Sequence, residues 1–316
     1  MNKKSVIAFI TDLRFLFWFL VILTILVSFA QSRQGFSHMW TPAIFKLSFY
    51  NLTHNQNMYA LHNQFEGQWV DIYKYSPAFA LLYAPIAALP LSIGMIVWNL
   101  LNVIVFFFAI RSLPFDNVKK AIIIAIGLLE LILSVQNSQS NILMCGLIIL
   151  GFTNMEKKNV LLATLCIVLS IYIKLFGVVA LMIFLFYPEK LKFIGYTILW
   201  SIILFFLPLL VVSVTELSKI YHDWAAILKL DATEVWQLSI MGVAKAWFGL
   251  SSPQIYIQLV GAIFLAIPLI SFKSYQNIQF RLLYLASILI WVVTFNHKAE
   301  SPSYIIAATG IGIWFV

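Results

Sequence analysis

A series of apolar stretches runs through this chain and limits its possible folds more than any other feature. The stretches are residues 15–30, 78–91, 93–110, 121–135, 141–153, 160–173, 175–186, 193–212, 255–271, 282–296 and 304–316. A helix needs about 20 apolar residues to cross a bilayer, so several stretches must tilt, include polar neighbours, or enter the membrane without crossing it. We predict an all-α fold, a polytopic transmembrane helical bundle with about nine or ten hydrophobic segments, some short or re-entrant. Residues 1–316 would form a single transmembrane domain.

The composition agrees with a membrane protein and argues against two other classes. Only 10% of the residues are charged, whereas soluble domains carry about 25%. The net charge of +8 comes from basic residues in short loops between apolar stretches, so we expect no nucleic-acid partner. Cys145 and Cys166 both lie inside apolar stretches and provide neither metal-ligand spacing nor a disulfide framework.

The distribution of lysine and arginine predicts the orientation of the chain. With a cytoplasmic N-terminus, and with residues 78–91 re-entrant or interfacial, the inner segments are residues 1–14, 111–120, 154–159, 187–192 and 272–281. They hold 12 of the 20 basic residues in about 46 positions, a density about three times that of the outer segments. Counting residues 78–91 as a full span would remove this bias. We therefore expect a multi-pass plasma-membrane protein with its active face outside, where both long loops, residues 31–76 and 213–253, would lie.

The end of the first outer loop brings charged and phenolic groups to the edge of an apolar stretch. Residues 69–77 read WVDIYKYSP. Ionisable groups at the edge of a membrane are candidates for function because burying a charge there is costly. Asp71 is either a solvated loop acid or a general base at the mouth of the bundle. Lys74, Tyr73 and Tyr75 can bind an anion or a sugar, although tyrosine is also common at membrane interfaces.

Two ionisable residues interrupt the apolar stretches themselves. Lys174 lies between residues 160–173 and 175–186, so it needs an anionic partner such as a lipid phosphate, or a water-filled cavity, unless it snorkels to the interface. Glu130 begins a polar stripe that continues along one helix face to Asn141. This acid is either satisfied by neighbouring hydroxyl groups or part of a proton or ion relay.

A second charged cluster lies in the last predicted outer turn, where residues 297–300 read HKAE. His297 and Glu300 are three residues apart, which suits one helix face or a metal ion. Two ligands alone do not make a metal site. We favour a phosphate-binding or acid–base role for His297, Lys298 and Glu300.

The second long loop mixes aromatic and acidic residues, among them Tyr221, Trp224, Asp231 and Trp236. Aromatic stacking and carboxylate hydrogen bonds are one way to hold a sugar. The same pattern is typical of an amphipathic helix at a membrane interface. The chain contains no phosphate loop, dinucleotide fingerprint or zinc-protease helix.

Several motifs, by their order and spacing, resemble glycosyltransferase family 87, a family of polytopic GT-C enzymes related to polyprenyl-phosphate-mannose-dependent mannosyltransferases. The motifs are residues 73–77 (YKYSP), 82–85 (LYAP), 89–90 (LP), 98–99 (WN), 136–141 (QNSQSN), 173–176 (IKLF) and 295–302 (FNHKAESP). Residues 136–141 resemble the Gly-Gln-x-Asn turn of the family, with Ser138 in place of the glycine. The resemblance extends from about residue 45 to the end.

The resemblance implies transfer of a hexose, which we expect to be mannose, from a polyprenyl-phosphate sugar to a lipid or glycan acceptor at the outer face. Such a reaction needs a base for the acceptor hydroxyl and cations for the departing phosphate. The expected residues are Asp71, His297 and Glu300 in catalysis, Lys174, Lys298 and Lys74 at the donor phosphate, and Tyr73, Tyr75, Gln136, Asn137 and Asn141 in substrate binding. We expect no cofactor and no metal.

Two other functions stay open at this point. A transporter or lipid flippase would use Glu130 and Lys174 as intramembrane charges and would need no base at Asp71. A structural membrane subunit would use its outer loops to bind a partner.

Two features depart from the pattern of the family. GT-C enzymes usually carry an acid soon after the first span, but residues 31–38 contain none. Asp71 is the best substitute for this base, and His38 is the second candidate. The chain also stops at Val316 inside an apolar stretch, whereas relatives generally continue through further spans, so we expect a truncated chain.

Overall fold

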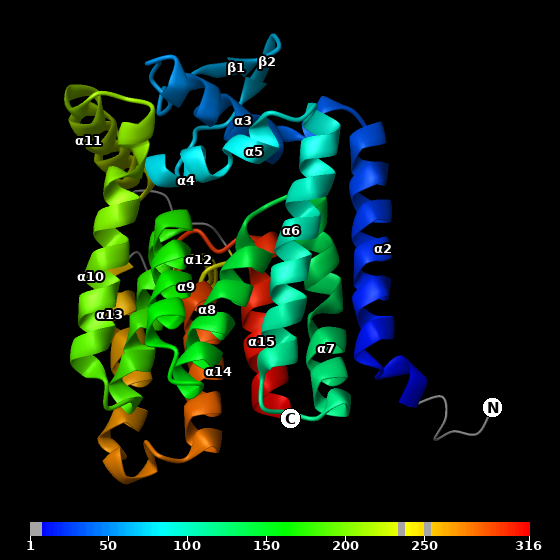
Figure 1. Ribbon diagram of the computed structural model, residues 1–316, viewed down its shortest axis with the longest axis vertical. Helices are drawn as coiled ribbons and strands as arrows, with labels where there is room; N and C mark the ends of the chain where they lie inside the picture. The colour runs from blue at the N-terminus through cyan, green and yellow to red at the C-terminus, as the bar shows by residue number, and fades with distance from the viewer. Residues whose placement is uncertain (1–7, 233–237, 250–253) are drawn as a thin grey trace.

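The structure is a computed structural model that describes residues 8–232, 238–249 and 254–316. The helices of a bundle run along its long axis, and a second group of elements gathers at one end (Figure 1). The elements at this end are α3 (Trp40–Thr53), β1 (Asn63–Phe65), β2 (Gln68–Val70), α4 (Pro77–Leu82), α5 (Ala84–Ala87) and α11 (Val214–Asp231). We refer to it as the loop end. Trp236 of the second long loop lies outside the described residues.

The bundle consists of helices that follow the apolar stretches of the sequence. They are α2 (Leu13–Arg33), α6 (Leu91–Ser112), α7 (Asn117–Gln136), α8 (Asn141–Glu156), α9 (Val160–Ile173), α10 (Lys190–Phe206), α13 (Gln254–Ala266), α14 (Ile278–Thr294) and α15 (Tyr304–Phe315). A further short helix, α12, covers Ile240–Phe248. The prediction of a mostly helical protein is therefore confirmed.

Three helices in the described part of the chain are long and apolar enough to cross a membrane. They are Leu13–Arg33, Leu91–Ser112 and Lys190–Leu210. Shorter apolar helices follow, such as α9 with 14 residues. At 1.5 Å per residue such a helix covers about 21 Å of a hydrocarbon core that is about 30 Å thick. The count of nine or ten segments and the outer position of the loop end stay predictions.

Several segments are 3-10 helices rather than α-helices, and the longest of them is apolar. The longest is η2 (Leu175–Phe186), and the shorter ones are η1 (Phe36–His38), η3 (Leu207–Leu210), η4 (Ile267–Ile270), η5 (Phe272–Ser274) and η6 (Ser301–Ser303). A 3-10 run of 12 residues is uncommon, because its hydrogen bonds have poorer geometry than those of an α-helix. Apolar periodicity does not distinguish the two helix types at this length.

Residues 78–91 do not form a spanning helix. They fold into α4, α5 and the start of α6, and the two short helices lie across the loop end (Figure 1). With six and four residues, neither can cross a bilayer, which agrees with a re-entrant or interfacial segment. Pro77 begins α4, and the Oγ of its N-cap Ser76 accepts a hydrogen bond from the N–H of Phe79 at 3.2 Å.

One β-hairpin interrupts the helical fold, and the sequence analysis did not predict it. Strands β1 and β2 pair antiparallel, with Asn63 opposite Val70. Glu66 and Gly67 form the two-residue turn with φ of 49° and 77°, the positive values that a tight hairpin requires. Phe65 and Val70 face inward and pack with Ala43 of α3. This packing fixes the chain that leads from β2 toward α4.

Helix α8 forms the centre of the bundle, packed between α6 and α9. From Asn141 to Met155, every residue except Leu150 is buried. Gly146 permits a close approach to α6, because a Cβ at this position would lie 3.1 Å from the backbone nitrogen of Phe106. The N-terminus of this buried helix therefore presents Asn141 at a fixed position near the loop end.

A charged pair joins the helices at the opposite end of the bundle. Glu156, the last residue of α8, accepts hydrogen bonds from Arg281 of α14, with Nε to Oε1 at 2.6 Å and Nη2 to Oε2 at 2.8 Å. The Tyr187 hydroxyl, which follows η2, also donates to Glu156. Bidentate pairs of this kind are directional and strong, so they fix the relative position of α8 and α14.

Candidate active site

A cavity of about 690 Å³ lies where the loop end meets the bundle. This volume is typical of ligand sites. Its polar wall includes Asp71, Lys74, Tyr75, Gln139, Lys174, Asp231, Asn296, His297, Lys298 and Glu300. Its apolar wall is formed by η2, α13 and α14, with Leu175, Phe176, Val178, Val179, Ile255, Leu259, Ala262, Trp291, Val292 and Phe295. The lining thus combines charged and polar side chains with hydrocarbon-like ones.

Lys174 reaches this cavity because the chain breaks its helix there. Its backbone is extended, with φ −142° and ψ 124°, and it separates α9 from η2. The turn that follows requires Gly177, since a Cβ at this position would lie 2.6 Å from the Oγ of Ser170. The break leaves the ammonium group at the polar wall instead of on the surface of a continuous helix.

The partners of Lys174 are neutral. Its Nζ donates to Asn141 Oδ1 at 2.9 Å and to Gln139 Oε1 at 3.4 Å. The same Nζ lies 5.6 Å from the ring centroid of Tyr75 and 5.7 Å from that of Phe176. Among the described residues, no carboxylate lies within 4 Å of it. Lys174 therefore carries an uncompensated positive charge into the cavity.

The turn between α7 and α8 supplies Gln139, and α6 holds this turn in place. The indole Nε1 of Trp98 donates to the carbonyl oxygen of Ser138 at 2.9 Å. The Nδ2 of Asn99 lies 3.0 Å from the Val135 carbonyl oxygen and 3.1 Å from Ser138 Oγ. Ser138 itself has φ of 49°, in the left-handed region that favours glycine.

Gln139 joins an acid to Lys174. Its Nε2 donates to Glu300 Oε2 at 2.6 Å, while its Oε1 accepts from Asn141 Nδ2 at 2.8 Å. The backbone N–H of Glu300 donates to Ser303 Oγ, which fixes the start of η6. The four side chains Glu300, Gln139, Asn141 and Lys174 form one hydrogen-bonded chain along the polar wall.

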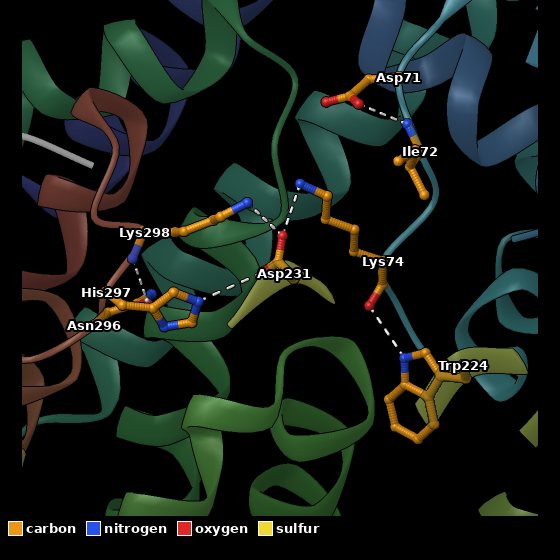
Figure 2. A network of polar contacts seen from close by, with 8 residues as sticks. All are labelled: Asp71, Ile72, Lys74, Trp224, Asp231, Asn296, His297 and Lys298. Carbon is orange, nitrogen blue, oxygen red and sulfur yellow. Dashed lines mark hydrogen bonds and ion pairs between the residues drawn. The ribbon is translucent and has the colours of Figure 1, made fainter. Parts of the chain in front are cut away.

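Asp231, the last residue of α11, holds a second set of cations. Its Oδ1 lies 2.9 Å from the Nζ of Lys74 and 2.5 Å from the Nζ of Lys298 (Figure 2). The Nε2 of His297 lies 3.6 Å from Oδ2. This distance is too long for a hydrogen bond but short enough for an ion pair if the ring is protonated. Burial alone would raise the pKa of this carboxyl, but the contacts from His297, Lys298 and Lys74 hold it well below its usual value.

This cluster joins three segments that are far apart in the sequence. Lys74 precedes α4, Asp231 ends α11, and Lys298 follows α14. The Nε1 of Trp224 in α11 also donates to the carbonyl oxygen of Lys74 at 3.1 Å (Figure 2). Both lysines share one carboxylate, so these three side chains are ion-paired and together keep a net charge of +1.

Asp71 lines the same cavity but stands apart from the cluster (Figure 2). It is exposed, and its Oδ1 accepts one hydrogen bond, from the backbone N–H of Ile72 at 2.7 Å. Its carboxylate makes no salt bridge with the described residues. Asp231 and Asp71 thus differ sharply, since Asp231 is held by cations and Asp71 is open to a ligand.

The comparison with protein families decides the identity of the chain. Residues 73–309 match the model of glycosyltransferase family 87. The chain belongs to this family. Comparisons with curated proteins and with solved structures found no match. The resemblance seen in the motifs is therefore confirmed, and the protein is a membrane glycosyltransferase.

The matched range of this glycosyltransferase covers most of the polar wall. Lys74, Lys174, Asp231 and the turn at residues 297–300 all lie inside it, whereas Asp71 lies two residues before its start. His38, the second candidate for the base, is not among the residues that line the cavity. Its Nδ1 lies 2.8 Å from Gln31 Oε1.

The family 87 chain brings most of its expected site residues together, but not all. Asp71, Lys74, Tyr75, Lys174, His297, Lys298 and Glu300 line the cavity. Asn141 is buried and contacts it through Lys174. Tyr73 is buried, and its hydroxyl donates to the Ser76 carbonyl oxygen at 2.9 Å. Gln136 and Asn137 do not line the cavity, and Asn137 Nδ2 donates to Leu133.

Glu130 also lies away from this cavity. Its Oε2 is buried and has no hydrogen-bond partner among the described residues. The next residue along the predicted polar stripe, Ser134, is buried with an unpaired Oγ as well. The prediction that this stripe continues along one helix to Asn141 is wrong, because α7 ends at Gln136 and Asn141 begins α8. Glu130 does not share a site with Lys174.

Two important residues of the glycosyltransferase cavity, Gln139 and Asp231, were not among the expected site residues. Asp231 was visible in the sequence only as one acid in an aromatic loop. Gln139 occupies the glutamine position of the turn motif at residues 136–141, which was the available signal. Within the described ranges, no group of three His, Cys, Asp or Glu side chains is placed to hold a metal ion. The expectation of a metal-free reaction stays a prediction.

Proposed function

We propose that this family 87 glycosyltransferase transfers a hexose, mannose, from a polyprenyl-phosphate sugar to a lipid or glycan acceptor. The observation that carries the proposal is the uncompensated charge of Lys174 in a cavity with one apolar wall. A lipid-linked phosphate sugar has the matching chemistry, because it joins a hydrocarbon chain to an anion. The excess of basic residues in the predicted inner loops supports a cavity on the outer side of the plasma membrane, with a cytoplasmic N-terminus.

Lys174 is assigned to the phosphate of the donor. Negative charge grows on the phosphate oxygen as the glycosidic bond breaks, so an ammonium group in a water-poor site stabilises the transition state more than the ground state. Asn141 and Gln139 orient the ammonium group through their carbonyl oxygens. Neither amide neutralises it, which leaves the full charge for the donor.

Asp71 is assigned to the acceptor. In the reaction, the acceptor hydroxyl oxygen forms a bond to the anomeric carbon while the bond from that carbon to the phosphate oxygen breaks with its electron pair. The hydroxyl proton passes to the Asp71 carboxylate, and polyprenyl phosphate leaves. Asp231 suits this role less, because its lowered pKa makes it a weaker base and its oxygens are engaged by Lys74 and Lys298.

His297, Lys298 and Glu300 border the same reaction space from the turn after α14. Lys298 and Lys74 are already paired with Asp231, so we assign them to closing the polar wall and to a secondary contact with the phosphate. Glu300 is held by Gln139, and His297 lies beside Asp231. Tyr75, with its ring beside Lys174, offers a stacking surface for the sugar.

The test is transfer from radiolabelled polyprenyl-phosphate mannose to endogenous lipid acceptors in membranes that contain the full-length protein. We expect Lys174→Ala to lower transfer by about 10²–10³-fold, since that is the loss when one electrostatic donor to a transition state is removed. We expect Asp71→Asn to reduce the rate by about 10²–10⁴-fold, since general-base catalysis contributes that much. The matched control is Glu66→Gln, which changes the acid at the hairpin turn, outside the cavity, and should retain normal transfer.

Each outcome bears on a different part of the proposal. An active Asp71→Asn protein would remove the base assignment but leave the donor assignment standing. Transfer that does not depend on Lys174 would remove the donor assignment. If the folded wild-type protein accepts a polyprenyl-phosphate glucose but not the mannose donor, the sugar is wrong and the reaction class is kept. Family membership favours a glycosyltransferase over the transporter and structural-subunit hypotheses.

A further inference from the structure

Gln139 separates an acid from a cation that line the same cavity. Its Nε2 donates to Glu300 Oε2 at 2.6 Å, and its Oε1 lies 3.4 Å from the Nζ of Lys174. One amide group therefore spans the gap between a carboxylate and an ammonium group. Asp231 and Lys74, which have no such spacer between them, pair directly at 2.9 Å in the same cavity.

The chemistry of the two neighbours selects glutamine at this position. An ionised carboxylate only accepts hydrogen bonds, and an ammonium group only donates them. Glutamine offers an N–H donor to Glu300 and a carbonyl acceptor to Lys174, so this contact geometry also fixes which way its amide faces. A glutamate would repel Glu300, a lysine would repel Lys174, and an apolar residue would satisfy neither.

The position of this amide is held rigidly. The turn that carries it is bound to Trp98 and Asn99 of α6, and Asn141 donates to its Oε1 at 2.8 Å. Because its rotamer is already fixed, this side chain loses no further conformational entropy when a ligand binds. The separation of Glu300 from Lys174 is thus built into the turn between α7 and α8.

We propose that Gln139 is a positioning residue that sets the affinity for the donor phosphate by keeping Glu300 out of contact with Lys174. The proposal rests on the proposed function, in which Lys174 binds this phosphate. A carboxylate in contact with Lys174 would compete with the phosphate for the same N–H donors and reduce the attractive charge. A neutral amide oxygen orients the ammonium group without that competition.

The first test is binding of farnesyl phosphate, a short polyprenyl phosphate, to the purified full-length protein in detergent. Quenching of tryptophan fluorescence would give Kd, with farnesol as the probe that has the same chain but no phosphate. We expect Gln139→Glu to weaken farnesyl phosphate binding by about tenfold or more and to leave farnesol binding unchanged. Gln64→Glu on the exposed face of the hairpin adds the same charge outside the cavity and should bind like wild type.

The second test separates electrostatics from structure. The double variant Gln139→Glu with Glu300→Gln exchanges the acid and the amide, so a hydrogen bond can form again between the two positions. If Gln139 only links two parts of the fold, this exchange should restore binding. If Gln139 insulates Lys174, binding should stay weak by about tenfold, because the exchanged carboxylate lies next to the ammonium group. The double variant also keeps the test decisive where Gln139→Glu fails to fold.

Lys174→Ala distinguishes a failure of this inference from a failure of the proposed function. If it binds farnesyl phosphate as well as wild type does, the phosphate site at Lys174 is wrong. If it loses binding while Gln139→Glu binds normally, or while the exchanged variant is restored, the phosphate site stands and the role of Gln139 is wrong. Midpoints of thermal unfolding within a few degrees of wild type would show that each variant is folded.

Discussion

Lys174 and the Asp231 cluster line one cavity, but they balance their charges in different ways. Lys74 and Lys298 share the carboxylate of Asp231, at 2.9 Å and 2.5 Å. Lys174 has two amide oxygens and two aromatic rings instead, and its nearest acid in this network is reached only through Gln139. The same residue type therefore serves two purposes within one site.

The difference separates structural charge from functional charge. A lysine that is paired inside the protein contributes mainly to the position of the segments that it joins. A lysine with neutral partners keeps its attraction for an anionic ligand, and partial burial without a counter-charge costs free energy that a bound phosphate recovers. By this criterion, we propose that Lys174 binds the donor and that the Asp231 cluster closes the loop end.

The largest expected effect comes from removing Lys174, and the comparison is the removal of Lys298 from the Asp231 cluster. We expect Lys174→Ala to lower kcat/KM by about 10²–10³-fold, the loss measured when one electrostatic donor to a transition state is removed. Lys298→Ala should cost about tenfold or less, because Lys74 remains to pair with Asp231. Initial rates of mannose transfer in membranes would compare the two. Equal losses would contradict the distinction between Lys174 and the lysines of the Asp231 cluster.

The next effect concerns the stability of the cluster. Asp231→Asn leaves the ammonium groups of Lys74 and Lys298 close together without their shared counter-charge. We expect the free energy of unfolding to fall by about 1–3 kcal/mol. The midpoint of thermal unfolding in detergent is the readout. The control Asp223→Asn, on the same helix but outside the cluster, should change it little. A wild-type midpoint for Asp231→Asn would show that the cluster does not hold the loop end.

The pH dependence of stability should follow from the same carboxylate. The pKa of Asp231 is lower in the folded chain than in the unfolded chain, where an aspartate titrates near about 3.9. Its contribution is therefore fully present above the unfolded value and is lost as the pH falls through the folded pKa. We expect the difference between wild type and Asp231→Asn to be constant from pH 7 to about pH 5 and to shrink below about pH 4. A difference that does not change with acidification would contradict the ionic origin of the effect.

The sequence was sufficient for the features that depend on local chemistry. Lys174 between two apolar stretches indicated an anionic partner, a water-filled cavity or snorkelling to the interface, and the structure provides a cavity. Residues 78–91, bounded by prolines, formed short helices rather than a span. The motif order predicted the family, which the match over residues 73–309 confirms.

Features that depend on distant contacts could not be read from the sequence. Asp231 meets Lys298 across 67 residues, and Gln139 meets Glu300 across 161. No spacing rule relates such pairs, because the packing of several helices brings them together. Tyr73 and Tyr75 show the same limit at short range, since both were expected to bind substrate, yet only Tyr75 lines the cavity.

The smallest expected effect concerns the turn that holds Gln139. Ser138 has φ of 49°, and its Oγ lies 3.1 Å from Asn99 Nδ2. In Ser138→Gly, the easier left-handed conformation offsets the lost hydrogen bond, so we expect a stability change below about 1 kcal/mol and transfer within about twofold of wild type. Ser138→Val should instead lower both, because a β-branched residue resists a positive φ and cannot pair with Asn99.

Unfolding midpoints and transfer rates of the two variants would be measured together, since they separate two roles of the turn. If the turn matters only for folding, transfer per folded molecule should be equal in Ser138→Gly and Ser138→Val. If it sets the position of Gln139 beside Lys174, Ser138→Val should transfer more slowly even when folded, with the loss in donor affinity rather than in kcat. A loss confined to kcat would indicate that the turn acts through Glu300 instead. Glu300 would then count, like Lys174, as a functional charge of the cavity.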